Sequence, residues 1–405
     1  SLAPAPIEQD PFTCIIGGPD CKQPYKASVL NISGMSYGAL SPNAILAMNR
    51  GAKEGGFAQN TGEGGVSPYH LRYGGDLIWQ IGTGYFSCRD DQGNFNADKF
   101  KQQAALDQIK LIEIKISQGA KPGHGGILPK EKITDEIAAV RGISREHDCI
   151  SPSSHSAFTT PLELMSFIAE LRELSDGKPI GMKISVGHPW EIMAICKAMV
   201  ETGTAPDFIT IDGGEGGTGA APLEFADHIG TPLREALAFV HNALVGTNLR
   251  SKIKLAASGK IASAFDIARA MALGADYCNA GRSFMFSVGC IQGQTCHTGH
   301  CPTGVTTQDP ARYRALDVND KFKRVKKFHS STMHALAEVV SAAGLTHPHQ
   351  IRRQHFFRRI SPNKVASYQE LFPPIEEGEI LIGTQDPRYK VAWQQATASS
   401  FKPEF

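Results

Sequence analysis

The sequence predicts an α/β fold, a TIM (β/α)8 barrel with an N-terminal hairpin and a C-terminal extension that wraps the barrel. Two observations carry this prediction. Short apolar runs rich in β-branched residues alternate with longer amphipathic segments, and glycine-rich polar motifs follow the strands. At 405 residues the chain is long enough for one large barrel. Because TIM barrels build their active sites from the loops that follow the strands, these motifs mark the candidate site.

The expected elements run in order along the chain. Strands are expected at residues 28–33, 78–83, 111–116, 148–151, 179–185, 207–212, 253–257 and 275–280. Helices are expected at residues 42–54, 161–174, 189–201, 232–245 and 262–272, several with proline in the first turn and glycine just after the last. We therefore divide the chain into an N-terminal extension (1–26), the barrel (27–310) and a helical C-terminal extension packed on it (311–405).

Composition narrows the function classes. The chain has 41 basic and 40 acidic side chains, so no long-range field attracts nucleic acid or an anionic membrane. No apolar run approaches 18 residues, and no signal peptide stands at the start. The nine cysteines are an odd number and are widely spread, which favours a reducing compartment. We expect a cytoplasmic protein, which would be membrane-anchored only through residues outside this sequence.

The segment at residues 212–219 (DGGEGGTG) contains the dinucleotide-binding pattern G-x-G-x-x-G after a strand. Pro222 follows at once and the next strand begins only near Ile253, which disfavours a Rossmann site. Glycines that let a flat ring or a phosphate approach the backbone are the better interpretation, and plain turn glycines are the alternative. Loops at residues 258–260 and 280–282 stand where TIM barrels bind phosphate, and Arg282 would add a charge-assisted contact.

Two lysines lie within apolar strand patterns. Lys183 and Lys115 would each be costly to bury without a negative partner, so an inward-facing Lys183 predicts an anionic cofactor or intermediate. The alternative for both is a side chain that extends outward to solvent.

A cysteine group forms the most specific local pattern. Cys290, Cys296 and Cys301 fall within twelve residues, and thiolates select zinc or iron–sulfur clusters. Zinc with His297 or His300 as the fourth ligand, a three-cysteine iron–sulfur cluster and unligated buried thiols all remain open at this point.

Ordered motifs over residues 17–310 resemble the FMN-binding synthase domain of glutamate synthase and the stand-alone FMN-binding glutamate synthase-like proteins. These motifs are residues 34–41 (GMSYGALS), 60–65 (NTGEGG), 114–123 (IKISQGAKPG), 125–129 (GGILP), 216–222 (GGTGAAP), 296–304 (CHTGHCPTG) and 307–310 (TQDP). The family fold is a TIM barrel, in agreement with the strand pattern.

The resemblance implies two cofactors, FMN and a 3Fe-4S cluster ligated by Cys290, Cys296 and Cys301. FMN would be held by Met35, Ser36, Gln80, Lys183, Gly214, Gly216, Gly217, Thr218, Ser258, Gly259, Gly281 and Arg282. The resemblance also implies catalytic roles for Glu63, Lys115, Gln118 and Lys121, and substrate binding by Lys132 and Ser151. In the family reaction, ammonia condenses with 2-oxoglutarate, and reduced flavin passes hydride to the resulting imine.

The sequence departs from the family pattern in ways that bear on partners and substrate. It contains neither a glutaminase domain with its N-terminal cysteine nor a nicotinamide module, so electrons would come from an external donor protein. His124 replaces a glutamate, and residues 151–157 (SPSSHSA) replace a run rich in proline and histidine.

We therefore expect an oxidoreductase acting on CH-NH2 donors that reduces an imine made from a 2-oxo acid and ammonia or an amine. A flavin enzyme with another small substrate and an electron-relay subunit are the alternatives. A homo-oligomer is compatible with the sequence, and no nucleic-acid partner is expected.

Overall fold

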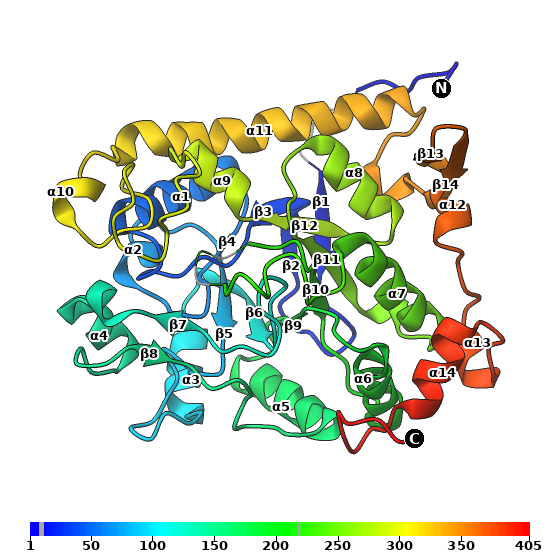
Figure 1. Cartoon of the computed structure of the whole chain (residues 1–405), viewed down its shortest axis with the longest axis horizontal. Coiled ribbons are helices and arrows are strands. Elements are labelled where there is room, and N and C mark those ends of the chain that lie inside the picture. Colours follow the sequence, from blue (N-terminus) through cyan, green and yellow to red (C-terminus); the bar gives the residue numbers. More distant parts are fainter. Residues whose placement is uncertain (8–11, 218, 220) are drawn as a thin grey trace.

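Eight parallel strands close into a barrel in the computed structural model, which describes residues 1–7, 12–217, 219 and 221–405 (Figure 1). The strands follow one another around the barrel in chain order. They are β3 (Leu30–Ile32), β4 (Gln59–Asn60), β5 (Leu77–Ile81), β6 (Ile109–Lys115), β9 (Ile180–Ile184), β10 (Phe208–Asp212), β11 (Lys254–Ser258) and β12 (Tyr277–Ala280). The predicted TIM barrel is confirmed.

Helices follow the strands and cover the outside of the barrel (Figure 1). They are α1 (Pro42–Gly55), α2 (Pro68–Leu71), α3 (Ala97–Ala104), α5 (Pro161–Leu174), α6 (Pro189–Thr202), α7 (Leu233–Gly246), α8 (Ala264–Ala272) and α9 (Arg282–Ser287). Helix α1 shows why these boundaries were readable: Ser41 caps the Ala44 N–H, Pro42 opens the helix, and Gly56 ends it in the left-handed region. At α5, Thr160 and Glu163 form a reciprocal capping box.

One predicted barrel strand was wrong. Residues 148–151 contain β8 (Cys149–Ile150), which pairs antiparallel with β7 (Ile127–Leu128) outside the barrel. With η1 (Lys130–Lys132) and α4 (Asp135–Arg141), these strands form an insertion between β6 and β9. The missing barrel strand is β4, whose two residues are both polar. Residues 118–126 therefore follow β6, the fourth barrel strand.

An N-terminal hairpin, β1 (Thr13–Ile16) and β2 (Tyr25–Ser28), closes the end of the barrel where the strands begin. Cys14 and Ile16 pack in one buried cluster with inward residues from the starts of the strands, among them Leu111, Phe208 and Tyr277. Because apolar side chains fill this end, the polar chemistry gathers at the opposite end, the mouth of the barrel.

Along each strand the inward positions alternate, as a period of two requires. On β6 the inward residues are Leu111, Glu113 and Lys115, and on β10 they include Phe208 and Thr210. The barrel interior thus changes from an apolar bottom to a polar layer and then to charged groups at the mouth. This gradient positions the candidate site.

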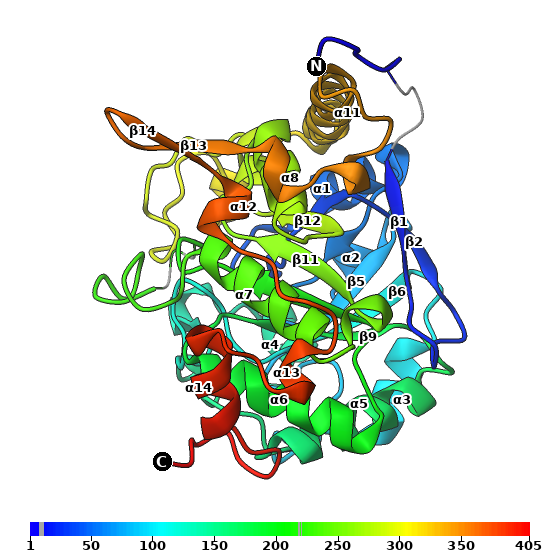
Figure 2. The same ribbon diagram turned by 90° about the vertical axis from the view of Figure 1, so that its right-hand side faces the viewer.

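The C-terminal region begins with α10 (Pro310–Tyr313) and the long helix α11 (Val318–Ala342), which packs across α1 and α8 (Figure 1). The chain then continues along the outside of the barrel (Figure 2). Its elements are η3 (Pro348–Gln350), η4 (Arg353–His355), β13 (Phe357–Ser361), β14 (Lys364–Ser367), α12 (Tyr368–Leu371), α13 (Glu379–Ile382) and α14 (Pro387–Gln395). Among the described residues, no helix combines the length and apolarity needed to cross a membrane.

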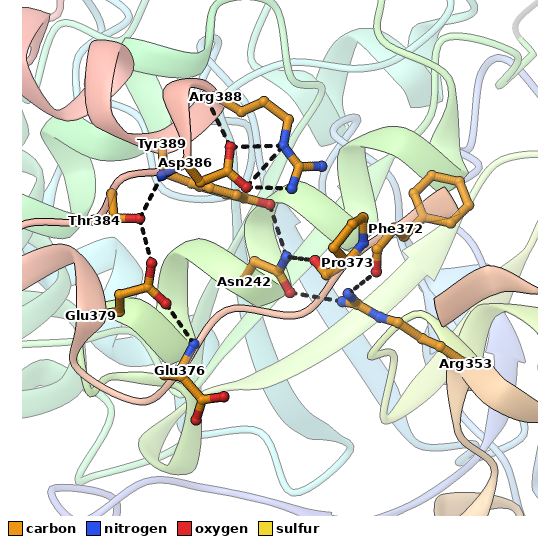
Figure 3. Close-up of polar contacts among 10 residues, drawn as sticks. All are labelled: Asn242, Arg353, Phe372, Pro373, Glu376, Glu379, Thr384, Asp386, Arg388 and Tyr389. Carbon is orange, nitrogen blue, oxygen red and sulfur yellow. Dashed lines mark hydrogen bonds and ion pairs between the residues drawn. The ribbon is translucent and has the colours of Figure 1, made fainter. Parts of the chain in front are cut away.

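One buried amide ties this C-terminal region to the barrel (Figure 3). The Asn242 side chain on α7 is 2% exposed. Its Nδ2 donates to the Pro373 carbonyl at 2.9 Å and to the Tyr389 hydroxyl at 2.8 Å. Its Oδ1 accepts from the Arg353 guanidinium at 2.8 Å. Three distant segments of the C-terminal region therefore meet on one side chain.

Candidate active site

A buried carboxylate organises the polar layer of the barrel. Glu113 of β6 is 1% exposed. Its Oε1 accepts from Asn60 Nδ2 at 2.9 Å and from Gln80 Nε2 at 2.7 Å, and its Oε2 accepts from the Thr210 hydroxyl at 2.6 Å. Three donors satisfy the buried charge, as a carboxylate in an interior requires. The predicted FMN residue Gln80 is therefore fixed in orientation by a residue that the sequence reasoning missed.

Lys183 lies inside the barrel rather than on its outer face. Its Nζ is 3.3 Å from Asp212 Oδ2, which also accepts from the Gly119 N–H at 2.9 Å. Burial opposes the charged ammonium, but Asp212 and Glu113 outweigh burial and raise the pKa of Lys183 above its ordinary value. Lys183 is consequently a cation at neutral pH, held next to the glycine-rich loop that begins at Gly213.

A second charged cluster forms at the mouth, above the polar layer. Glu63 Oε1 is 2.9 Å from Lys115 Nζ, and Lys121 Nζ donates to the Gly125 carbonyl at 3.1 Å. Burial acts to raise the pKa of Glu63, but Lys115, then Lys121 and Arg141, outweigh it and lower that pKa. Burial lowers the pKa of Lys121, with Glu63 opposing. The cluster is one carboxylate surrounded by three cations.

The chain comes unusually close to Glu63 at two glycines, Gly82 and Gly126. A Cβ placed on Gly126 would lie 2.4 Å from Glu63 Oε1, well inside van der Waals contact. Only glycine leaves space for the carboxylate there. This contact brings the start of the insertion, next to β7, against the loop that follows β4.

Arg141, from helix α4 of the insertion, also belongs to this cluster. Its side chain is buried, and its Nη2 donates to the Tyr37 carbonyl at 3.2 Å and reaches the Ser36 hydroxyl at 3.5 Å. Its Nε is buried and has no hydrogen-bond partner within the part of the chain that the structure describes. The sequence reasoning missed Arg141. The one sequence feature that marks its position is the glycine that follows it, Gly142, which ends helix α4 in the left-handed region.

Loops after β10, β11, β12 and β3 meet at another part of the mouth. A Cβ on Gly217 would lie 2.2 Å from Arg282 Nη2, so this glycine lies directly on the guanidinium. Ser258 Oγ is 3.5 Å from Ser33 Oγ, and the Ser258 carbonyl accepts from the Gly213 N–H at 2.9 Å. At Gly281, by contrast, an added Cβ would meet no atom closer than 3.7 Å.

These loops contain most of the residues predicted for FMN. Met35 Sδ is 3.9 Å from the position of a Cβ on Gly281. The Gly214 and Gly216 N–H groups donate to the carbonyls of Thr231 and Gly213, each at 2.8 Å. Gly259 has φ +128°, which favours glycine. Thr218 lies outside the described residues.

The fit to a phosphorylated flavin rests on three features: the open backbone face at Gly281, the Arg282 guanidinium beside it in the chain, and the buried Asn279 Oδ1. That oxygen has no hydrogen-bond partner among the described residues. A ligand that combines a phosphate with hydrogen-bonding ring edges suits such a set. The residues present therefore fit FMN.

Two further predicted residues lie in the loops around the charged cluster of Glu63, Lys115 and Lys121. Gln118 is half-buried, and its carbonyl accepts from the Lys121 N–H at 3.3 Å. Ser151 is 6% exposed, and its N–H donates to the Gly126 carbonyl at 2.9 Å. His155, by contrast, is buried away from solvent between the Tyr85 hydroxyl and the Lys115 carbonyl. Burial lowers the pKa of His155 to about 4, so it is neutral at physiological pH.

The cysteine loop, which we define as residues 290–308, follows α9. Cys296 lies against the glycine loop, since a Cβ on Gly219 would be 2.3 Å from Cys296 Cβ. Burial acts to raise the pKa of Cys301, but hydrogen bonds from Thr306 and Thr303 outweigh it and lower that pKa to about 7. Thiolates are the ligands that iron–sulfur centres need, so the donor set fits such a centre in kind. In the described part of the chain, however, no three His, Cys, Asp or Glu side chains are gathered around one metal position.

Lys132, predicted to bind substrate, is 3% exposed and faces this loop. Its Nζ donates to the carbonyls of Ala39, Cys296 and Thr306 at 3.0, 3.1 and 3.4 Å. Burial lowers the pKa of Lys132 to about 8, with Cys296 and Cys301 opposing the shift.

Comparison with known proteins places this site in a family. The family model described as "Conserved region in glutamate synthase" matches residues 14–346. The glutamate synthase large subunit-like protein YerD of Bacillus subtilis is 41% identical over 373 residues, which cover 90% of this chain and 71% of YerD. The chain belongs to the glutamate synthase family. Membership makes it an oxidoreductase of the glutamate synthase type.

Other relatives are longer than this chain. The archaeal glutamate synthase [NADPH] of Methanocaldococcus jannaschii is 37% identical over 322 residues, covering 79% of this chain and 60% of that protein. The chain thus spans between about 60% and 71% of these two relatives. A mandelate oxidase crystal structure superimposes with a TM-score of 0.52 at 16% identity, covering 87% of this chain and 84% of that one. At this identity the likeness supports the barrel fold alone.

Proposed function

We propose that this chain is an FMN- and iron–sulfur-dependent oxidoreductase that reduces an imine formed from 2-oxoglutarate and ammonia or an amine. The observation that carries the proposal is the convergence of Lys115, Lys121 and Arg141 on Glu63 at the mouth of the barrel. Three cations around one carboxylate leave net positive charge in a partly buried site. A dicarboxylate such as 2-oxoglutarate is complementary to that charge.

FMN supplies hydride-transfer chemistry when bound. The loops after β3, β10, β11 and β12 would hold FMN, with Lys183 and Gln80 contacting the ring system and Arg282 binding the phosphate. Lys183 keeps a positive charge there because Asp212 and Glu113 stabilise it. A fixed cation beside the ring favours an anionic reduced cofactor.

The surrounding residues would do the rest of the chemistry. Lys115 and Lys121 would bind the carboxylates of the oxo acid, and Arg141 would add the bidentate geometry that lysine lacks. Glu63, ionised in the resting cluster, would accept a proton from the incoming ammonium and return one to the nitrogen as the imine is reduced. Gln118, in the same loop as Lys121, would hydrogen-bond the substrate.

The three thiols of Cys290, Cys296 and Cys301 would ligate a 3Fe-4S cluster that receives electrons from an external donor protein. Support comes from the all-cysteine donor set and the low pKa of Cys301. The match to the relative named glutamate synthase [NADPH] covers 60% of that protein, and the electron donor of this chain is proposed separately from that name.

A substituted amine in place of ammonia is the second candidate. His124, which departs from the family pattern, packs edge-on against Phe225 with ring centroids 5.1 Å apart. This aromatic pair adds apolar surface in the loop that also contains Lys121. An alkyl group on the amine would suit such a surface better than ammonium does.

A turnover assay separates these candidates. The protein, loaded with FMN and reduced by dithionite through methyl viologen, would be given 2-oxoglutarate with ammonium or with methylamine. We expect glutamate or N-methylglutamate to form, and Glu63→Gln to abolish either product while flavin stays bound. If wild-type protein with bound flavin forms neither product, the proposed reaction is wrong.

A further inference from the structure

The ammonium of Lys132 has no hydrogen-bond donor to spare. A lysine ammonium carries three N–H donors. Those of Lys132 are taken by the carbonyls of Ala39, Cys296 and Thr306. A substrate carboxylate would have to displace one of these acceptors in a site that is 3% exposed. The stem of the side chain also packs on the cysteine loop, since a Cβ on Gly299 would lie 3.8 Å from Lys132 Cγ.

The two lysines of the mouth cluster differ from Lys132. Lys115 pairs with the Glu63 carboxylate, and Lys121 donates to the single carbonyl of Gly125. Within the described residues, each of these ammonium groups therefore keeps N–H donors for a ligand. Substrate binding can be carried by Lys115 and Lys121 without Lys132.

The cysteine loop is tied to the loop between β3 and α1 mainly through its later half. The Ser41 hydroxyl donates to the Gly304 carbonyl at 2.6 Å, and the Ser41 N–H donates to the Val305 carbonyl at 2.9 Å. Gln308 Nε2 donates to the Gly38 carbonyl at 3.0 Å. Lys132 is different because it holds Cys296, in the earlier half, to Thr306 in the later half.

We propose that Lys132 is a positioning residue of the cysteine loop, which holds Cys296 and Cys301 in place for the electron-accepting centre, and not a ligand of the oxo acid. The inference rests on the proposed function, because it assigns Lys132 to the electron-delivery side of that same site. A buried cation beside thiolate ligands also favours the more negative, reduced state of the centre they hold. Removal of the charge should therefore make the reduction potential of the centre more negative.

The test compares Lys132→Met with Lys121→Met as the reciprocal control. After reconstitution with iron and sulfide, we expect Lys132→Met to bind at least twofold less iron than wild type, or to hold a centre with a more negative potential. Its KM for 2-oxoglutarate should stay within twofold of wild type. Lys121→Met should show the opposite result, with KM raised at least tenfold and iron content and potential unchanged. Lys132→Arg, which keeps the charge and the donors, should restore much of the iron binding.

The contrary result is a tenfold rise in KM for Lys132→Met with an unchanged iron centre, which would make Lys132 a substrate ligand. If Lys132→Met does not fold, as judged by circular dichroism, Lys132→Gln replaces it. Wild-type protein that takes up no iron refutes the proposed cluster instead. In that case, the rate of Cys296 alkylation in cluster-free protein tests whether Lys132 holds the cysteine loop in place. Iodoacetamide should react with Cys296 at least fivefold faster in Lys132→Met than in wild type. Equal rates would overturn the inference.

Discussion

Asn242 offers the sharpest test of how the C-terminal region is held to the barrel (Figure 3). Asn242→Ala removes two neutral hydrogen bonds, to Pro373 and Tyr389, and one from the Arg353 guanidinium. At about 1 kcal/mol for each neutral bond and about 1.5–3 kcal/mol for the charged one, the loss is about 3.5–5 kcal/mol. Tyr389 and Arg353 are 2% and 6% exposed, so the bonds they lose are not replaced by water, whereas the exposed Pro373 carbonyl can bond water instead.

Urea unfolding followed by circular dichroism, together with limited proteolysis, measures this effect. Because a chain of this size need not unfold in one step, the proteolysis pattern matters as much as the midpoint. We expect cleavage within residues 353–395 before the barrel is lost. Gln394→Ala, at an exposed position on α14, is the matched control and should change stability by less than about 0.5 kcal/mol. A loss below about 1 kcal/mol for Asn242→Ala would refute the reasoning.

Three further predictions concern the mouth. Burial lowers the pKa of Lys121 from its ordinary value of 10.5, so Lys121 loses its charge at a lower pH than a free lysine does. The KM for 2-oxoglutarate should therefore rise as the pH increases through that range. Lys121→Arg should move this rise in KM to higher pH. Gly126→Ala places a Cβ 2.4 Å from Glu63 Oε1 and should lower kcat at least tenfold while flavin stays bound. In the control variant Gly187→Ala, the new Cβ meets no atom nearer than 3.5 Å, and kcat should stay unchanged. Lys183→Met should make the flavin potential more negative, and an unchanged potential in a redox titration would count against its placement beside the ring.

The barrel was predictable because its motifs obey simple rules of chain chemistry. Helix α5 has the predicted bounds, because Thr160, Pro161 and Glu163 mark its start by capping. Strand β4 was missed because Gln59–Asn60 is short and polar, so no apolar pattern marks it. Residues 148–151 do contain a strand, β8, but sequence alone could not show that its partner is β7 outside the barrel.

Site residues could be predicted where a charged residue interrupts an apolar strand. They could not be predicted where their role depends on contacts between segments far apart in the sequence. Lys183 was recognisable because a buried lysine needs a negative partner; the sequence indicated an anionic cofactor or intermediate, and within the chain that partner is Asp212. Glu113 occupies the same kind of position on β6, yet its role depends on donors from β4, β5 and β10. Arg141 reaches the mouth only because the insertion folds over the β3–α1 loop.

The most direct test of the account is the visible absorbance spectrum of the purified protein before and after dithionite. The account predicts the visible absorbance of a bound flavin, superimposed on a broad iron–sulfur absorbance, and bleaching of both on reduction. A colourless protein that stays colourless after reconstitution with FMN, iron and sulfide would contradict it.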